Sequence, residues 1–106
     1  MSIEEQLKEV VEGNDVVLFM KGSPDFPQCG FSGLATQILQ QCGTRFASVD
    51  VLADNAVREG IKTYSNWPTI PQLYIKGEFI GGSDIIKEMF ENGELQKKLE
   101  GIATEA

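Results

Sequence analysis

The sequence contains no histidine and only two cysteines, Cys29 and Cys42, among its 106 residues. A tetrahedral zinc site or an intact iron-sulfur site needs about four ligands, which are usually histidine and cysteine side chains. A single chain therefore has too few ligands for such a site. Either no metal binds, or other molecules complete the coordination.

Positively charged residues are also scarce. The sequence has 9 Lys and Arg but 16 Asp and Glu, which gives a net charge of −7. Binding to phosphate backbones depends on an excess of cations, so the balance argues against a nucleic-acid partner, although a local basic patch could still bind a small anion. No apolar run approaches the ~20 residues that span a bilayer. The N-terminus has the pattern of an acidic amphipathic helix rather than of a signal or transit peptide. We expect a soluble protein of a reducing compartment, with no membrane partner.

The length of 106 residues and the 42% hydrophobic content suit one compact domain with one core. We expect this domain to cover residues 1–106, with the last few residues forming a loose tail. No internal repeat or low-complexity segment interrupts it.

Hydrophobic periodicity and turn residues predict an alternation of helices and strands. In order, the expected elements are a helix capped by Ser2 and Glu5 and ended at Gly13, a buried strand at 15–20, a helix from Cys29 to Gly43, a strand at 45–51, a short helix capped by Asp54, a hairpin with strands at 72–75 and 78–80, a helix from Ser83 or Asp84 to Gly93, and a short helix at 94–100. The strand-helix-strand unit should be parallel and the hairpin antiparallel. This order predicts the α/β class and a thioredoxin-like fold, with a four-stranded mixed sheet and helices on both faces.

The segment Trp67-Pro68-Thr69-Ile70-Pro71 leads into the hairpin. Residues before proline are restricted to extended conformations, and proline donates no hydrogen bond. We therefore expect this segment to enter the third strand as an exposed edge that is poor in hydrogen bonds. Pro71 is a candidate for a cis peptide bond.

Cys29 follows a polar, proline-containing loop that starts at Lys21, and it stands where a helix begins. Free N–H groups and the helix dipole stabilise negative charge at that position, so the thiolate should be favoured. Ser32 stands where a dithiol motif would have its second cysteine, so Cys29 has no neighbour with which to form a disulfide. Cys42 should face the core at the far end of the same helix, roughly 20 Å away if that helix is continuous.

Three motifs, Cys29-Gly-Phe-Ser32, Trp67-Pro-Thr-Ile-Pro71 and Gly81-Gly-Ser-Asp84, occur in an order and spacing that resembles the monothiol glutaredoxins of the Cys-Gly-Phe-Ser class over nearly the whole chain. The resemblance implies that the loop and the two later motifs meet in a groove that binds glutathione. Phe31 could belong either to the core or to the wall of this groove.

The resemblance also implies a role for each residue of the groove. Lys21 and Arg58 would hold the glycyl carboxylate of glutathione, with Lys62 as a possible helper, and the backbone of Ile70 would pair with the cysteinyl unit. Ser83 and Asp84 would hold the γ-glutamyl carboxylate and ammonium. Alternatively, Arg58 and Lys62, four residues apart, are only part of a solvated helix surface. Ser83 and Asp84 could likewise serve only to cap the helix that begins there. Relatives often have cysteine where this chain has Ser83, which matters little if the contact there comes from the backbone.

The ligand count leads to the function that the resemblance implies. Cys29 and one glutathione thiolate supply two of the four ligands of a 2Fe-2S cluster, so two chains and two glutathiones complete it. We therefore expect a monomer when apo and a homodimer when cluster-bound, which delivers the cluster to apo iron-sulfur proteins or joins a BolA-type protein. The expected location is the cytoplasm of a bacterium, with a processed organellar form as the alternative. The alternatives are a glutathione-dependent oxidoreductase that uses Cys29 on mixed disulfides, and an interaction module with an incidental cysteine.

Overall fold

In the computed structural model, which describes residues 1–104, four strands form one mixed sheet. The strands are β1 (Val16–Met20), β2 (Ala47–Asp50), β3 (Gln72–Ile75) and β4 (Glu78–Gly81), in the spatial order β2-β1-β3-β4. β1 pairs with β2 in parallel, with Phe19 opposite Val49, and with β3 in the antiparallel sense, with Leu18 opposite Leu73. β3 and β4 form an antiparallel hairpin.

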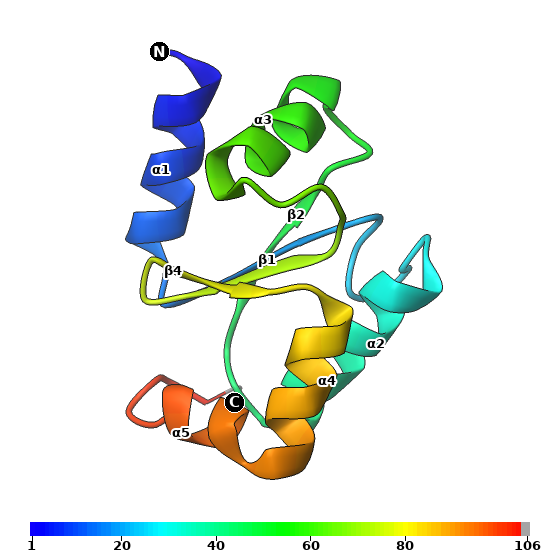
Figure 1. Ribbon diagram of the computed structural model, residues 1–106, viewed down its shortest axis with the longest axis vertical. Helices are drawn as coiled ribbons and strands as arrows, with labels where there is room; N and C mark the ends of the chain where they lie inside the picture. Colours follow the sequence, from blue (N-terminus) through cyan, green and yellow to red (C-terminus); the bar gives the residue numbers. More distant parts are fainter. Residues whose placement is uncertain (105–106) are drawn as a thin grey trace.

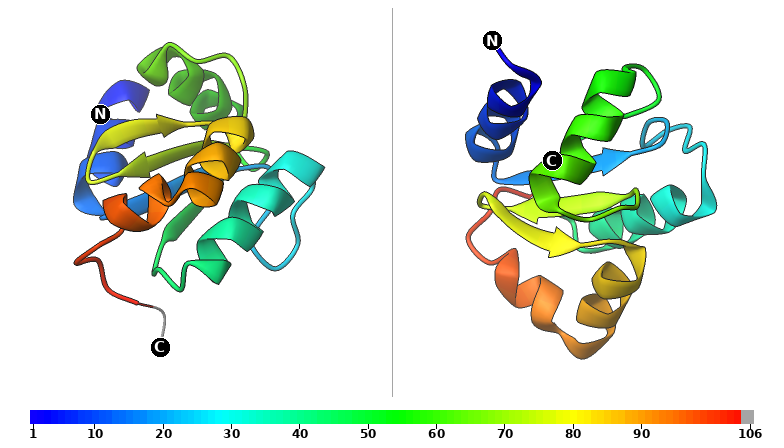
Figure 2. Two further views of the ribbon diagram at one scale, coloured as in Figure 1. Left: turned by 60° about the horizontal axis from the view of Figure 1, so that its bottom comes forward. Right: turned by 45° about the horizontal axis from the view of Figure 1, so that its top comes forward.

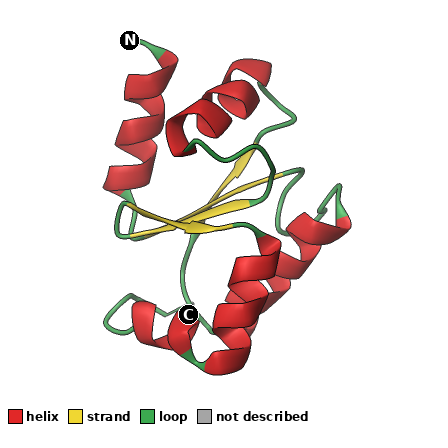
Figure 3. Cartoon of the chain, viewed as in Figure 1, coloured by secondary structure: helices red, strands yellow, loops and turns green. Residues whose placement is uncertain are grey.

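Helices cover both faces of this sheet (Figure 1). They are α1 (Ile3–Gly13), α2 (Gly30–Gln41), α3 (Asn55–Ser65), α4 (Ser83–Asn92) and α5 (Glu94–Lys98). α1 and α3 lie on one face, while α2, α4 and α5 lie on the other, as the cartoon in Figure 3 and the turned views in Figure 2 also show. The expected α/β class and thioredoxin-like architecture are confirmed.

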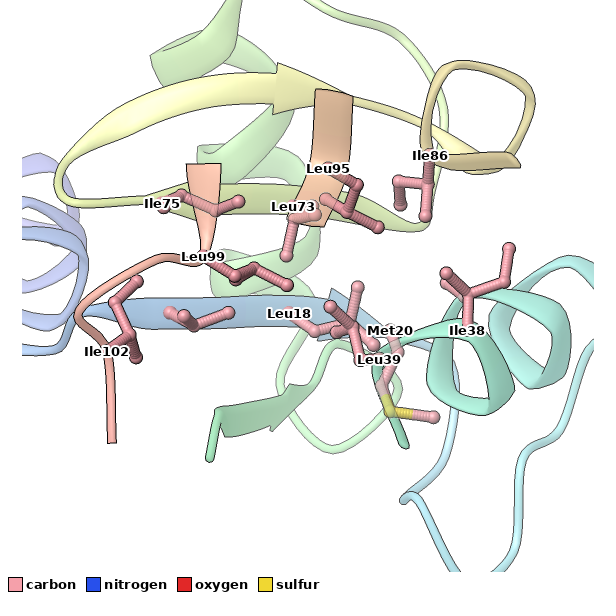
Figure 4. Packing of buried hydrophobic residues seen from close by; sticks show 12 residues of the cluster. Leu18, Met20, Ile38, Leu39, Leu73, Ile75, Ile86, Leu95, Leu99 and Ile102 are labelled. Atoms are coloured by element: carbon pink, nitrogen blue, oxygen red, sulfur yellow. The ribbon is translucent and has the colours of Figure 1, made fainter. Parts of the chain in front are cut away.

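The alternation of side chains along β1 divides the core between the two faces of the sheet. Leu18 and Met20 join a cluster with α2, α4 and α5, which includes Leu39 and Ile86 (Figure 4). Phe19 lies on the other face, in the cluster beneath α1 and α3. All five residues of β1 are buried, which confirms the prediction of a central strand covered on both sides.

The caps of α1, α3 and α4 test the expected helix ends. Ser2 and Asp54 are N-caps as expected, and their side chains accept hydrogen bonds from the backbone N–H groups of Glu5 at 3.1 Å and of Ala56 at 2.9 Å. However, α1 is ended by Asn14 rather than by Gly13. α4 begins at Ser83, as expected, and its N-cap is Gly82, which has no side chain to accept a hydrogen bond.

The segment before β3 is exposed at residues 67–69, as expected, but it does not lead into an edge of the sheet. β3 lies between β1 and β4 and is buried along its length, because the hairpin places β4 outside it. The prolines precede the strand, so they remove no hydrogen bond from the sheet. The peptide bond between Ile70 and Pro71 is cis, as expected. The second strand is shorter than the predicted 45–51.

The end of the chain returns toward the segment before β2. The backbone N–H of Arg45 donates to the carbonyl of Ala103 at 3.0 Å, and Thr44 forms a bridge with Thr104. The rest of the expected loose tail, residues 105 and 106, lies outside the described residues. Among residues 1–104, no helix is both long enough and apolar enough to cross a membrane.

Candidate functional site

The loop between β1 and α2 is held by its own backbone and by Asp50 at the end of β2. The N–H of Gln28 donates to the carbonyl of Lys21 at 2.9 Å, and Gly22 forms a bridge with Pro27. The Asp50 carboxylate accepts hydrogen bonds from the N–H groups of Gly22 at 3.0 Å and of Leu52 at 2.9 Å. The loop is therefore anchored to the neighbouring parallel strand at the same edge of the sheet.

Gly22 is required by the geometry of this loop. Its φ of +89° lies in the left-handed region, and a Cβ there would approach the carbonyl oxygen of Phe26 to 2.5 Å. A residue with a side chain would therefore be strained and would clash with the backbone. The glycine allows the chain to turn sharply between the strand and Cys29.

Cys29 is the N-cap of α2 and is half-buried. Its pKa is lowered, first by a hydrogen bond from the backbone N–H of Ser32. Partial burial opposes this effect, while the N–H of Phe31, the charge of Lys21 and the hydroxyl of Ser32 add to it. The expected thiolate at a helix N-terminus is thus supported by named donors and a cation.

Cys29 opens into a cleft of about 500 Å³. The residues that line it include the first turns of α2 and α4, and Figure 1 shows these two helices beginning on its right side. The lining residues are Lys21, Cys29, Phe31, Arg58, Lys62, Pro68, Thr69, Ile70, Pro71, Ser83 and Asp84. Every residue that was predicted from the sequence to line the groove, including Lys62, lines this cleft. Phe31 is 61% exposed, so it is a wall of the cleft and does not belong to the core.

The cations of the cleft are available to different degrees. Within residues 1–104, the Nε atom of Arg58 is buried and has no hydrogen-bond partner, although buried guanidinium groups are normally satisfied. Lys62 forms an ion pair with Glu59 at 3.4 Å. No ion pair within the same residues involves Lys21 or Arg58. These two cations are therefore free to bind an anion in the cleft.

The first turn of α4 forms the opposite end of the cleft. Its N-cap, Gly82, makes no side-chain cap hydrogen bond. Ser83 is half-buried and Asp84 is exposed, and both line the cleft. A Cβ on Gly82 would lie 3.4 Å from the carbonyl oxygen of Pro71, so this turn lies beside the start of β3. Neither Ser83 nor Asp84 is used as an N-cap, which removes the helix-capping alternative.

Cys42 lies at the opposite end of α2, where it is the C-cap. It is free and half-buried, and it packs against the cluster that contains Leu39. Burial raises the pKa of its thiol, so it is not activated. The predicted core location is confirmed. No group of three His, Cys, Asp or Glu that could hold a metal ion occurs in the described part of the chain.

Two residues that support the site were not singled out in the sequence. Asp50 anchors the loop before Cys29, and the side chain of Gln72 binds the backbone of the segment before β3. Gln72 could have been noticed in the sequence, because its polar amide interrupts an otherwise apolar strand and a buried amide needs hydrogen-bond partners. Asp50 gave no comparable signal, because acidic residues at strand ends are common in exposed turns.

The family model described as Glutaredoxin matches residues 16–80 of the chain. A Synechocystis protein named "Uncharacterized monothiol glutaredoxin ycf64-like" is 56% identical over 95 residues, which cover 90% of this chain and 89% of the relative. The "Probable monothiol glutaredoxin 2" of Rickettsia typhi is 50% identical over 93 residues, which cover 88% and 84%. The match to the rice protein "Monothiol glutaredoxin-S11" covers only 20% of that longer protein.

Solved structures agree with these matches. The solution structure of reduced poplar apo GrxS14 has a TM-score of 0.81 and 52% identity, with 92% of this chain and 90% of that chain covered. A buckwheat glutaredoxin-glutathione complex has a TM-score of 0.82, with coverage of 92% and 86%, but at 23% identity it shows the fold alone. From these matches, this chain belongs to the glutaredoxin family, among the monothiol glutaredoxins.

Proposed function

We propose that the cleft binds glutathione, and that Cys29 and the glutathione thiolate together hold a 2Fe-2S cluster that two copies of the chain share. The protein then carries this cluster as cargo to apo iron-sulfur proteins. The observation that carries the proposal is the convergence of Lys21, Arg58, Ile70, Ser83 and Asp84 around Cys29 in one cleft.

The charges of the cleft suit glutathione group by group. Glutathione carries two carboxylates, one ammonium and one thiol. Lys21 and Arg58 are suited to the glycyl carboxylate, and the unpartnered Nε of Arg58 gives that carboxylate a donor it can satisfy. The free first turn of α4 at Ser83 suits the γ-glutamyl carboxylate, and the Asp84 carboxylate suits the ammonium. The Ile70 backbone is suited to pair with the cysteinyl unit in between.

The supply of sulfur ligands supports a cluster shared between two chains. Cys29 is the thiol at the cleft, and Cys42 lies beyond the whole length of α2, which is ~18 Å for a helix of this size. Cys29 and one glutathione provide two of the four ligands that a 2Fe-2S cluster needs. A second chain with its own glutathione completes the set, so the holo form is a homodimer and the apo form a monomer.

Delivery suits this arrangement better than storage. Half of the ligands belong to a tripeptide that can dissociate, so the cluster is held weakly enough to be passed on. The recipients that we propose are apo iron-sulfur proteins, with a BolA-type protein as an alternative partner on the same cleft. The relatives from Synechocystis and Rickettsia are bacterial, and the reduced thiol suits the bacterial cytoplasm.

A second function is favoured by one observation, the lowered pKa of the half-exposed Cys29. As a glutathione-dependent oxidoreductase, the Cys29 thiolate attacks the glutathione sulfur of a mixed disulfide and releases the substrate thiolate. A second glutathione thiolate then attacks the glutathionylated Cys29, which yields glutathione disulfide and restores the Cys29 thiolate. Steady-state turnover of a glutathione mixed disulfide at the rates of dithiol glutaredoxins would favour this function over the carrier.

Titration with reduced glutathione under anaerobic conditions, followed by NMR, tests the binding step. We expect Arg58→Gln to weaken binding about tenfold, since it removes a charge-assisted hydrogen bond worth about 1.5–3 kcal/mol. Lys97→Gln, which removes an exposed cation of α5, is the matched control and should bind like the wild type. Equal affinity in all three proteins would contradict the assignment of the cleft.

A further inference from the structure

The side chain of Gln72 is completely buried at the point where the wall of the cleft becomes β3. Its amide nitrogen donates to the carbonyl of Trp67 at 3.1 Å and to the carbonyl of Thr69 at 3.2 Å. Its amide oxygen accepts a hydrogen bond from the hydroxyl of Tyr74 at 3.2 Å. Both donor hydrogens and the acceptor are therefore used, as burial of an amide demands.

The alternation of side chains along β3 determines which face of the sheet this amide occupies. Gln72 and Tyr74 are two residues apart in β3, so their side chains lie on the same face. Tyr74 belongs to the cluster beneath α1 and α3, where it also packs edge to face against Phe19 at 5.7 Å between ring centroids. Tyr74 thus fixes the amide oxygen, and the fixed oxygen makes the amide nitrogen point toward Trp67 and Thr69.

The two carbonyls that Gln72 binds belong to the segment that forms the wall of the cleft. Thr69 lines the cleft, together with its neighbours Pro68 and Ile70. Trp67 is also held from the other side, because its N–H donates to the carbonyl of Lys62 at 3.1 Å and to the hydroxyl of Ser65 at 3.1 Å. Gln72 therefore connects the end of α3 with the start of β3 across this wall.

We infer that Gln72 is a positioning residue, which holds the backbone from Trp67 to Ile70 in the conformation that binds the extended peptide part of the ligand. This inference rests on the proposed function, since it concerns the same cleft. Gln72 contributes no atom to the lining of the cleft, so it acts only through the carbonyls that it binds. Pre-organisation of this wall lowers the ordering cost of binding.

The test compares two changes in the same strand. Gln72→Leu removes both donors and keeps a similar volume, whereas Ile75→Ala removes packing at the far end of β3, in the other core cluster. We expect Gln72→Leu to weaken the binding of reduced glutathione about tenfold, and Ile75→Ala to lower the melting temperature while binding within twofold of the wild type. The inference is overturned if Gln72→Leu binds within twofold of the wild type, or if Ile75→Ala loses as much affinity.

A second variant covers the case in which Gln72→Leu does not fold. Gln72→Glu keeps the shape of the side chain and the acceptor for the Tyr74 hydroxyl, but a carboxyl group has at most one donor hydrogen, so it cannot bind the carbonyls of Trp67 and Thr69 together. It should also bind reduced glutathione about tenfold more weakly. Binding within twofold of the wild type would overturn the inference.

A measurement without ligand separates this inference from the proposed function. ¹⁵N relaxation of the apo protein reports the motion of the Thr69 and Ile70 backbone. We expect more motion at these two residues in Gln72→Leu or Gln72→Glu and unchanged motion in Ile75→Ala, even if the wild type proves not to bind glutathione. Unchanged motion in the Gln72 variants would overturn the positioning role while leaving the proposed function intact.

Discussion

The buried hydroxyl of Ser32 accepts a hydrogen bond from the backbone N–H of Lys21 at 3.0 Å. This bond joins the first turn of α2 to the end of β1 and closes the loop that carries the thiol. Ser32 also supports the Cys29 thiolate through its N–H and its hydroxyl. The residue at the position of a second cysteine in dithiol motifs is therefore both an anchor of the loop and a donor to the single thiol.

Ser32→Ala should reduce the free energy of unfolding by about 1–3 kcal/mol, because it leaves the N–H of Lys21 without its partner in a part-buried position. Urea unfolding measures this change. Ser48→Ala, which alters an exposed serine of β2, is the control and should change the stability by less than about 0.5 kcal/mol. Equal stability of the two variants would show that the bond contributes nothing.

The thiolate of Cys29 should form at a lower pH than that of an ordinary cysteine, because Ser32, Phe31 and Lys21 all lower its pKa. The rate of alkylation against pH, measured in a Cys42→Ala background, gives the titration of Cys29 alone. Lys21→Gln removes the favourable charge and should shift the curve to higher pH, while Lys97→Gln should not shift it. A curve at or above the ordinary cysteine range would contradict the activation of this thiol.

Much of the fold could be predicted from the sequence because its signals are local. The unbroken apolar run of β1 indicated a strand buried on both faces, and the Lys76-Gly77 turn indicated the hairpin. The order of the strands depends on contacts that no local pattern contains, so the segment before β3 was wrongly expected to lead into an edge of the sheet. α4 begins at Ser83, so the residue before it, Gly82, stands at the N-cap and neither Ser83 nor Asp84 occupies that position.

The candidate site could be predicted for a different reason. Cys29, the cations and the turn at Ser83 follow recognisable motifs, and the structure brings them to one cleft. The supports of the site could not be found in the same way. Asp50 and Gln72 act through hydrogen bonds to backbone groups far along the chain or across a turn, and such partners are defined only by the folded geometry.

Asp50→Ala should loosen the loop before Cys29, because it removes the acceptor for the N–H groups of Gly22 and Leu52. We expect a loss of about 2 kcal/mol of stability, as for hydrogen bonds to a charged group, and faster amide exchange at Gly22. Asp25→Ala, an exposed change in the same loop, is the control. Unchanged exchange at Gly22 in the Asp50 variant would contradict the anchor.

The stability of the protein should fall between about pH 10 and pH 12 because of Tyr74. Burial is the main cause that raises the pKa of Tyr74 to about 12. The phenol of the unfolded chain ionises near pH 10, so above that pH the unfolded state loses its proton first and unfolding becomes easier, by up to about 1.4 kcal/mol per pH unit. Below about pH 10 both states keep the proton, and this residue adds no pH dependence.

Urea unfolding at several pH values compares the wild type with Tyr74→Phe, in which this part of the fall is absent. Tyr64→Phe, a change in the tyrosine that packs beside Tyr74 at 6.0 Å between ring centroids, keeps Tyr74 and should retain the wild-type fall. If the wild type and Tyr74→Phe lose stability in parallel above pH 10, the raised pKa of Tyr74 is wrong.

The most direct test of the central claim is the iron, sulfide and glutathione content of the protein after anaerobic reconstitution with glutathione, together with its mass in solution. We predict a coloured dimer with about one iron, one sulfide and one glutathione per chain, which is lost in Cys29→Ser and retained in Cys42→Ala. A colourless monomer without iron under the same conditions would contradict the account.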